Sequence, residues 1–153
     1  MYLYVKKHDF LDNFETKDYP SDFYPKELEE LGKEILERNF MSKETTYQVG
    51  YWRKANAIHK WFVDNCGDGE DTCQRMYVDE EDLKGLLELV NEVLLDHNKA
   101  SELLPTQSGF FFGTQDYGEW YYEDLKYTKE LIEKVLKFVE ENKKYQIIYQ
   151  ASW

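Results

Sequence analysis

The sequence predicts a single α+β domain over residues 1–153, with about four helices packed on a small, mostly antiparallel sheet. Three observations lead to this fold class. Apolar residues recur at helical spacing in four segments, and β-prone segments lie at both ends of the chain. The chain has 153 residues, 42% of them hydrophobic, which suits one core. We expect the N- and C-terminal strands to pair with each other.

The N-terminal third predicts a strand, a loop and a helix. Residues 1–7 alternate in hydropathy and are rich in Tyr, Leu and Val, as strands are. Residues 8–24 are aromatic and acidic and include Pro20, so we expect an irregular loop. Pro25 then opens a helix to about Asn39. Proline is favoured in the first turn, because backbone N–H groups there have no partner within the helix and proline has no N–H to leave unpaired.

The middle of the chain predicts a short strand followed by a helix. Residues 45–49 are rich in residues that favour strands. A helix is expected over about residues 51–65, and Gly67 and Gly69 end it.

The C-terminal half predicts two longer helices and the last strand. Asp79 is a suitable N-cap for a helix over about residues 80–97. Asp116 is expected to cap a long fourth helix, with Glu119 at the capping-box position. Residues 145–150 are apolar and β-prone and predict the C-terminal strand.

Charge and aromatic content limit the classes of partner. The net charge is −12, which disfavours duplex nucleic acid and anionic membranes as partners. It fits a well-solvated surface, or a surface that engages a basic protein. Aromatic residues make up 17% of the chain and include 13 tyrosines, which suits either the core or an interface, including one in a homo-oligomer.

The two cysteines, Cys66 and Cys73, flank a short acidic loop. A disulfide between them is sterically possible, but one pair does not make the framework of a secreted protein. The N-terminus has no signal-peptide layout, and no apolar run approaches the length of a membrane span. We therefore expect a cytoplasmic protein with reduced thiols.

The segment from Tyr51 to Phe62 carries the first candidate binding residues. At about 100° per residue, Trp52 and His59 fall on the apolar face of a helix, and Arg53 and Asn56 fall on its edge. Arg53 suits a phosphate, Asn56 a base edge or ribose hydroxyl, and His59 an anion or general-base role. The same pattern also fits a core histidine with satisfied nitrogens and an arginine paired with a surface acid.

The loop over residues 105–113 is the second candidate. Thr106, Gln107 and Ser108 supply neutral donors, and successive N–H groups up to Gly109 can form an anion nest. The loop lacks the lysine and spacing of a phosphate-binding P-loop, and a simple tight turn also explains it. Across a shared pocket, Trp52 or Tyr121 would stack on the ligand.

No motif predicts a metal, a cofactor or a catalytic residue. The carboxylates between Asp64 and Asp71 do not follow EF-hand spacing and fit a solvated charge run. The two cysteines and His59 lack zinc-site spacing and a fourth ligand. Ser108 and His59 have no nucleophile-elbow context.

Several blocks resemble one protein family. These are YWRKANAIHKWFVDN, the following GED, LLPTQSGFFFG, EWYYEDLKYT and the terminal IIYQASW. In these blocks the chain is similar to small uncharacterised proteins of tailed bacteriophages and prophages, over roughly its C-terminal two-thirds. The resemblance implies an accessory protein acting in the cytoplasm of an infected bacterium. By analogy with phage accessory proteins, a counter-defence role is expected.

Three functions remain open at this point. The first is binding of a small nucleotide-like signalling molecule between helix 51–65 and loop 105–113. The second is inhibition of a host protein through the acidic, tyrosine-rich surface, without a pocket. The third is metal-dependent phosphodiester hydrolysis using His59 with Glu70 or Asp71, for which no fixed spacing exists.

Overall fold

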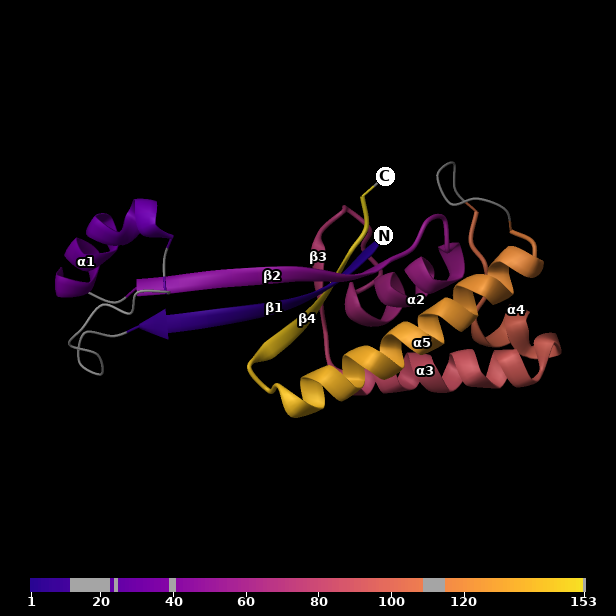
Figure 1. The fold of residues 1–153 in the computed structure, drawn as a ribbon. Coiled ribbons are helices and arrows are strands. Elements are labelled where there is room, and N and C mark those ends of the chain that lie inside the picture. The colour runs from indigo at the N-terminus through magenta and orange to yellow at the C-terminus, as the bar shows by residue number, and fades with distance from the viewer. Residues whose placement is uncertain (12–22, 24, 39–40, 109–114, 153) are drawn as a thin grey trace. The chain divides into compact units, whose positions relative to one another are not determined.

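The computed structural model describes residues 1–11, 23, 25–38, 41–108 and 115–152 (Figure 1). Its fold class is α+β, as predicted. The four strands of the described residues form one antiparallel sheet in the order β2-β1-β4-β3. They are β1 (Tyr2–Leu11), β2 (Met41–Tyr51), β3 (Arg75–Val78) and β4 (Tyr145–Gln150).

The helices described are α1 (Glu29–Arg38), α2 (Asn56–Cys66), α3 (Glu80–Leu95), α4 (Ala100–Leu103) and α5 (Glu119–Glu141), with 3-10 turns η1 (Lys26–Leu28) and η2 (His97–Lys99).

The chain divides into two compact units. One comprises residues 1–5 and 47–153, and the other comprises residues 6–46. The first unit holds the hydrophobic core and the candidate site.

The smaller unit contains β1 from Lys6 onward, the helix α1, and β2 up to Thr46. The predicted helix after Pro25 is confirmed as the turn η1 followed by α1. The Lys33 ammonium lies 2.7 Å from the Glu29 carboxylate one turn earlier. The predicted loop over residues 8–24 is wrong at its start, because β1 continues to Leu11, and most of its remainder lies outside the described residues.

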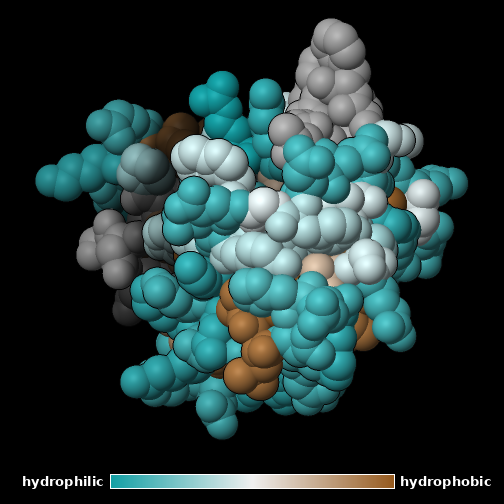
Figure 2. All heavy atoms as spheres, turned by 90° about the vertical axis from the view of Figure 1, so that its right-hand side faces the viewer, coloured by the Kyte–Doolittle hydropathy of each residue, from teal (hydrophilic) through white to brown (hydrophobic). Residues whose placement is uncertain are grey.

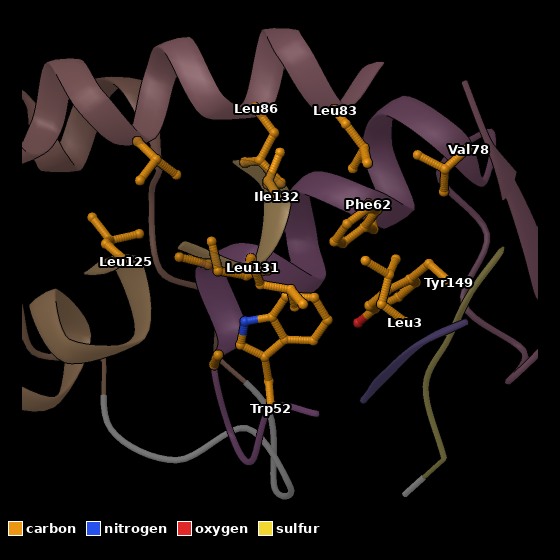
Figure 3. Packing of buried hydrophobic residues seen from close by; sticks show 14 of the residues in the cluster. Leu3, Trp52, Phe62, Val78, Leu83, Leu86, Leu125, Leu131, Ile132 and Tyr149 are labelled. Carbon is orange, nitrogen blue, oxygen red and sulfur yellow. The ribbon is translucent and has the colours of Figure 1, made fainter. Parts of the chain in front are cut away.

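Side chains from the sheet, α2, α3 and α5 form the core of the larger unit (Figure 3). Leu3 from β1 and Tyr149 from β4 face Phe62 of α2, and the rings of Phe62 and Tyr149 stack at 4.0 Å. The helices α3 and α5 pack along each other and contribute Leu83, Leu86 and Ile132. These residues are fully buried, and α3 contacts both α2 and α5, the two helices that carry the candidate site.

The predicted pairing of the terminal strands is confirmed, since β1 lies next to β4. The strand β3 was not predicted; it pairs antiparallel with β4 and places Met76 opposite Tyr149. Only Met76 and Val78 of its four residues are buried, so its alternation is too short to stand out.

The prediction that a helix begins at residue 51 is wrong. Tyr51 is the last residue of β2, and α2 begins at Asn56. The Trp52 N–H donates to the Met1 carbonyl at 2.9 Å, and the Met1 ammonium donates to the Trp52 carbonyl at 3.1 Å. These bonds keep the chain extended, and Lys54 then turns it with a left-handed φ of 65°.

The prediction that Asp116 caps the fourth helix is also wrong. Gly118 is the N-cap of α5, and Glu119 is its first residue. The Thr106 hydroxyl donates to the Gln115 carbonyl at 3.0 Å, and the Thr106 N–H donates to the Tyr117 hydroxyl at 3.3 Å. These bonds hold residues 115–117 against the preceding loop instead of in a helical turn.

The capping of α3 by Asp79 is confirmed, although the helix ends at Leu95, two residues earlier than predicted. Both cysteines are free thiols. None of the helices that the structure describes has the length and apolar character needed to cross a membrane.

Candidate ligand-binding pocket

The larger unit has a pocket of about 280 Å³ at the start of α2. Four stretches form it: the turn and first helical residues after β2, one residue of the loop that follows α4, one residue shortly before α5, and the first turns of α5. Its lining residues are Arg53, Lys54, Ala55, Asn56, Ala57, Ile58, Thr106, Asp116, Trp120, Tyr121, Asp124 and Leu125. The volume is near the lower end of the roughly 300–1,000 Å³ usual for small-molecule sites.

Two cations lie at the turn between β2 and α2. Arg53 and Lys54 are both exposed and both line the pocket. The Asn56 N–H donates to the Lys54 carbonyl at 2.9 Å, which closes the turn that presents them. Within the described part of the chain, neither cation forms an ion pair, so both are available to an anionic ligand.

Two adjacent aromatic residues of α5 form another wall. Trp120 is 82% exposed, whereas Tyr121 is buried and donates its hydroxyl to the Leu104 carbonyl at 2.9 Å. Burial, then the neighbouring Tyr117 and Tyr122, raise the pKa of the Tyr121 phenol well above its usual range, so it remains a donor. Tyr121 is therefore fixed in place, and the ring of Trp120 is open to a flat partner.

Asp124 lies one turn further along α5 and also lines the pocket. Burial, with a smaller contribution from the charge of Glu123, raises the pKa of its carboxyl to about 6. The Asp124 backbone carbonyl accepts from the Thr128 hydroxyl at 2.6 Å. Its carboxylate makes no hydrogen bond or ion pair to any residue in the described ranges. A half-buried acceptor without a partner is a natural contact for a ligand donor.

Neutral polar groups complete the pocket. The buried Asn56 carbonyl oxygen accepts from the Gln107 N–H at 3.4 Å, which links α2 to the loop after α4. Thr106 is held by its two bonds to residues 115 and 117. The loop is thus tied to both walls.

The structure brings together four of the nine residues predicted as a binding site: Arg53, Asn56, Thr106 and Tyr121. Gln107 contacts Asn56 but does not line the pocket, and Ser108 is exposed outside it. Gly109 lies outside the described residues. Trp52 and His59 are in the core, at 1% and 0% exposure.

His59 is satisfied on both ring nitrogens. Its Nε2 lies 2.9 Å from Asp71 Oδ2, and its Nδ1 lies 2.8 Å from the Tyr149 hydroxyl. Burial, then the charge of Asp71, raise the pKa of the Tyr149 phenol well above its usual range, so the phenol keeps its proton. A carboxylate can only accept, so Nε2 donates to Asp71. His59 therefore ties α2 to β4 and to the loop after α2.

Trp120, Asp124, Lys54 and Asp116 line the pocket but were not predicted as binding residues. A signal for two of them was present: Trp120, Tyr121, Asp124 and Leu125 follow the i, i+1, i+4, i+5 spacing of one helix face. Of these four residues, only Tyr121 was predicted to contact a ligand. Trp120 escapes the core because it lies in the first turn of α5, beyond the region where α3 covers the helix.

The surrounding surface is mainly hydrophilic on the face drawn in Figure 2, which is the end of the unit where α4 and the start of α5 lie. Only a small group of strongly hydrophobic residues is visible there.

Among the described residues, no group of three His, Cys, Asp or Glu side chains could hold a metal ion. Burial, then Asp82 and Asp79, raise the pKa of the Cys66 thiol to about 12, which makes it a poor nucleophile.

Comparison of the chain with protein-family models, with curated proteins and with solved structures gave no match.

Proposed function

We propose that the protein binds a small nucleotide-like signalling molecule in the pocket between the start of α2, the loop after α4 and the first turns of α5. The observation that carries this proposal is the combination of lining groups. Arg53 and Lys54 supply charge for a phosphate, the open ring of Trp120 supplies a stacking surface, and Asn56 and Thr106 supply neutral polar contacts. The volume of about 280 Å³ suits one nucleoside unit better than a linked pair.

The biological setting of the proposal comes from the sequence resemblance to tailed-phage proteins. A phage accessory protein that sequesters a nucleotide signal in the host cytoplasm would act in counter-defence. Sequestration requires tight binding and no turnover, which is compatible with a pocket that no histidine or cysteine of the described residues lines.

The test is isothermal titration and thermal shift of the purified chain against a panel of mononucleotides and cyclic nucleotides. Binding stabilises the folded state, so the expected result is a rise in melting temperature that depends on ligand concentration. Trp120→Ala should weaken binding by about 1–3 kcal/mol, the usual contribution of one stacked base. No shift with any member of the panel at millimolar concentration rules out the proposal.

Matched variants separate the pocket from general surface effects. Arg53→Ala should weaken phosphate-bearing ligands by about 1.5–3 kcal/mol, the range for hydrogen bonds to charged groups. Lys126→Ala removes an exposed cation of α5 that does not line the pocket, and it should leave affinity unchanged. Equal losses from both variants would indicate only long-range attraction.

A second candidate function is inhibition of a host protein, and the outer face of the sheet favours it. Tyr2 and Tyr4 alternate with the buried Leu3 and Val5 and so point away from the core. The Tyr2 ring lies 5.4 Å from that of Tyr51, which is 48% exposed. Tyrosines are enriched at protein interfaces, and the net charge of −12 suits a basic partner.

Two variants distinguish the candidates in one pull-down from host lysate. Tyr51→Ala should release a partner bound at the sheet face, and Trp120→Ala should not. Because the attraction would be electrostatic in part, capture should also weaken as salt is raised. Capture that is insensitive to Tyr51→Ala removes this candidate.

A further inference from the structure

The pocket carries charges of both signs. Arg53 and Lys54 line it together with two carboxylates, Asp116 and Asp124. Asp116 is exposed and remains hydrated, but Asp124 is half-buried. A ligand with only anionic and apolar groups would leave the Asp124 carboxylate without a partner and less hydrated than in the free protein. The ligand must therefore offer hydrogen-bond donors to Asp124 as well as an anion to the cations.

The positions of Trp120 and Asp124 specify where those donors lie on the ligand. The two residues are four apart on α5, so they are neighbours on one face of the helix, about 5–6 Å apart at Cβ. A flat ring stacked on Trp120 would thus turn its edge toward Asp124. The donors belong to the edge of the stacked ring and not to the phosphate end.

Asp124 presents two acceptor oxygens and no donor when ionised. Among the common bases, guanine offers two adjacent donors on one edge, the ring N1–H and the exocyclic N2 amino group. Adenine and cytosine place an amino donor beside a ring acceptor, and uracil places its ring N–H between two carbonyls. Guanine is therefore the only one of these bases that can donate to both carboxylate oxygens at once. Each of the others would place an acceptor against one of the two oxygens.

Given the nucleotide binding proposed above, on which this step rests, we propose that the pocket is selective for guanine nucleotides and that Asp124 reads the base. Trp120 stacks on the guanine, and Arg53 and Lys54 meet its phosphate.

The experiment is titration of the full chain with GMP, IMP, AMP and XMP. The wild-type protein should bind GMP roughly tenfold or more tightly than AMP, as expected for a bidentate base contact. IMP, which lacks the 2-amino group, should bind more weakly than GMP. Equal affinity for all four nucleotides would overturn the inference and leave the proposed nucleotide binding intact. No binding of any of the four would also overturn the inference, and no binding across the whole panel of mononucleotides and cyclic nucleotides would remove both.

A specificity exchange tests Asp124 directly. Asp124→Asn presents one acceptor and one donor, which match the N1–H and the C2 carbonyl of xanthine. This variant should lose at least tenfold in GMP affinity and gain affinity for XMP. Since XMP binding requires a folded pocket, its gain excludes misfolding as the cause of the GMP loss. Retention of the guanine preference by Asp124→Asn would overturn the inference.

A neighbouring acid provides the matched control. Glu123→Gln removes the same charge from the adjacent residue, which is exposed and does not line the pocket. The Glu123→Gln variant should still bind GMP more tightly than AMP. The pH dependence adds a second readout: burial raises the pKa of Asp124 to about 6, so the affinity for guanosine, which has no phosphate to titrate in this range, should rise between pH 5 and pH 7.5 in the wild type and stay flat in Asp124→Asn. A flat wild-type profile would contradict the role of the ionised carboxylate.

Discussion

At the scale of single residues, the buried imidazole of His59 shows how a side chain with catalytic potential serves the fold. Both ring nitrogens have partners, Asp71 on one side and Tyr149 on the other. The second carboxylate oxygen of Asp71 is buried without a partner among the described residues. These two contacts join α2 to the loop that follows it and to β4, so their loss affects stability before it affects any ligand.

Tyr149→Phe tests the structural role of His59. The variant keeps the ring that stacks on Phe62 at 4.0 Å but removes the hydroxyl that contacts Nδ1. A buried polar atom left without a partner costs about 1–3 kcal/mol, so the free energy of unfolding should fall by that amount. Chemical denaturation measures the change.

Tyr145→Phe, on the same strand, is the control for that measurement. Tyr145 is only partly buried, so its variant should lie within about 0.5 kcal/mol of wild type, as surface substitutions usually do. Nucleotide affinity should be unchanged in both variants, because neither residue lines the pocket. Equal stability of the two variants would show that the His59 contact carries no net stabilisation.

Gly50 is a second residue on which packing depends. A Cβ added there would lie 2.4 Å from Leu131 Cδ2 and 3.2 Å from Leu3 Cβ. Gly50→Ala should therefore destabilise the fold by about 1–3 kcal/mol, the usual cost of overpacking a core. Gly85→Ala in the middle of α3 meets no atom within 4 Å and should instead stabilise by up to about 1 kcal/mol. Thermal melts of the two variants should shift in opposite directions.

At the scale of elements, most helices and the terminal strands could be predicted from the sequence, whereas the first residues of α2 and α5 could not. The C-terminal strand, the cap of α3 and the apolar stripe of α5 from Leu125 to Val139 follow from local pattern, because burial there repeats with the helical or strand period. The starts of α2 and α5 do not. Bonds between residues distant in the chain hold these segments extended: Met1 bonds to a residue 51 positions away, and Thr106 bonds to residues 9 and 11 positions away.

The candidate site was predicted only in part for the same reason. Arg53 and Asn56 could be identified because the residue types suit a polar ligand, and they remain beside the pocket although residue 53 is not helical. The spacing of Trp120 on α5 is that of the helix's apolar face, yet in the fold the residue is 82% exposed. The spacing of Asp124 places it on the same helix face, but the half-burial of its carboxylate depends on neighbours far along the chain.

Asp82 offers a test at the N-terminus of α3. Its carboxylate accepts from the Asp79 N–H at 2.9 Å, and it lies in a first turn with three acidic residues. Asp82→Ala should cost about 0.5–2 kcal/mol, the range for losing a capping interaction. Glu88→Ala, at an exposed position of the same helix, should be neutral. A neutral Asp82→Ala in urea denaturation would show that the first turn is held by packing alone.

At the scale of the whole molecule, the half-buried Asp124 carboxylate that we propose recognises the ligand is expected to lower the stability of the free fold. The carboxyl pKa of Asp124 is about 6 in the folded chain against an ordinary 3.8, because burial disfavours the ionised form. The fold thus carries a penalty above pH 6 that disappears as the pH falls toward 3.8, where the carboxyl is protonated in both states. Asp124→Asn removes the charge, so it should be more stable than wild type at pH 8.

The expected gain at pH 8 is about 1 kcal/mol, since Asp124 is only half-buried and solvent screens part of the shift. The difference should shrink through pH 6 and vanish near pH 4, which urea denaturation at several pH values can follow. A guanine ligand that pairs the ionised carboxylate removes the penalty in the wild type alone. Saturating GMP at pH 8 should therefore raise the melting temperature of the wild type more than that of the variant. A variant less stable than wild type at pH 8 would mean that the carboxylate already has a partner in the free fold.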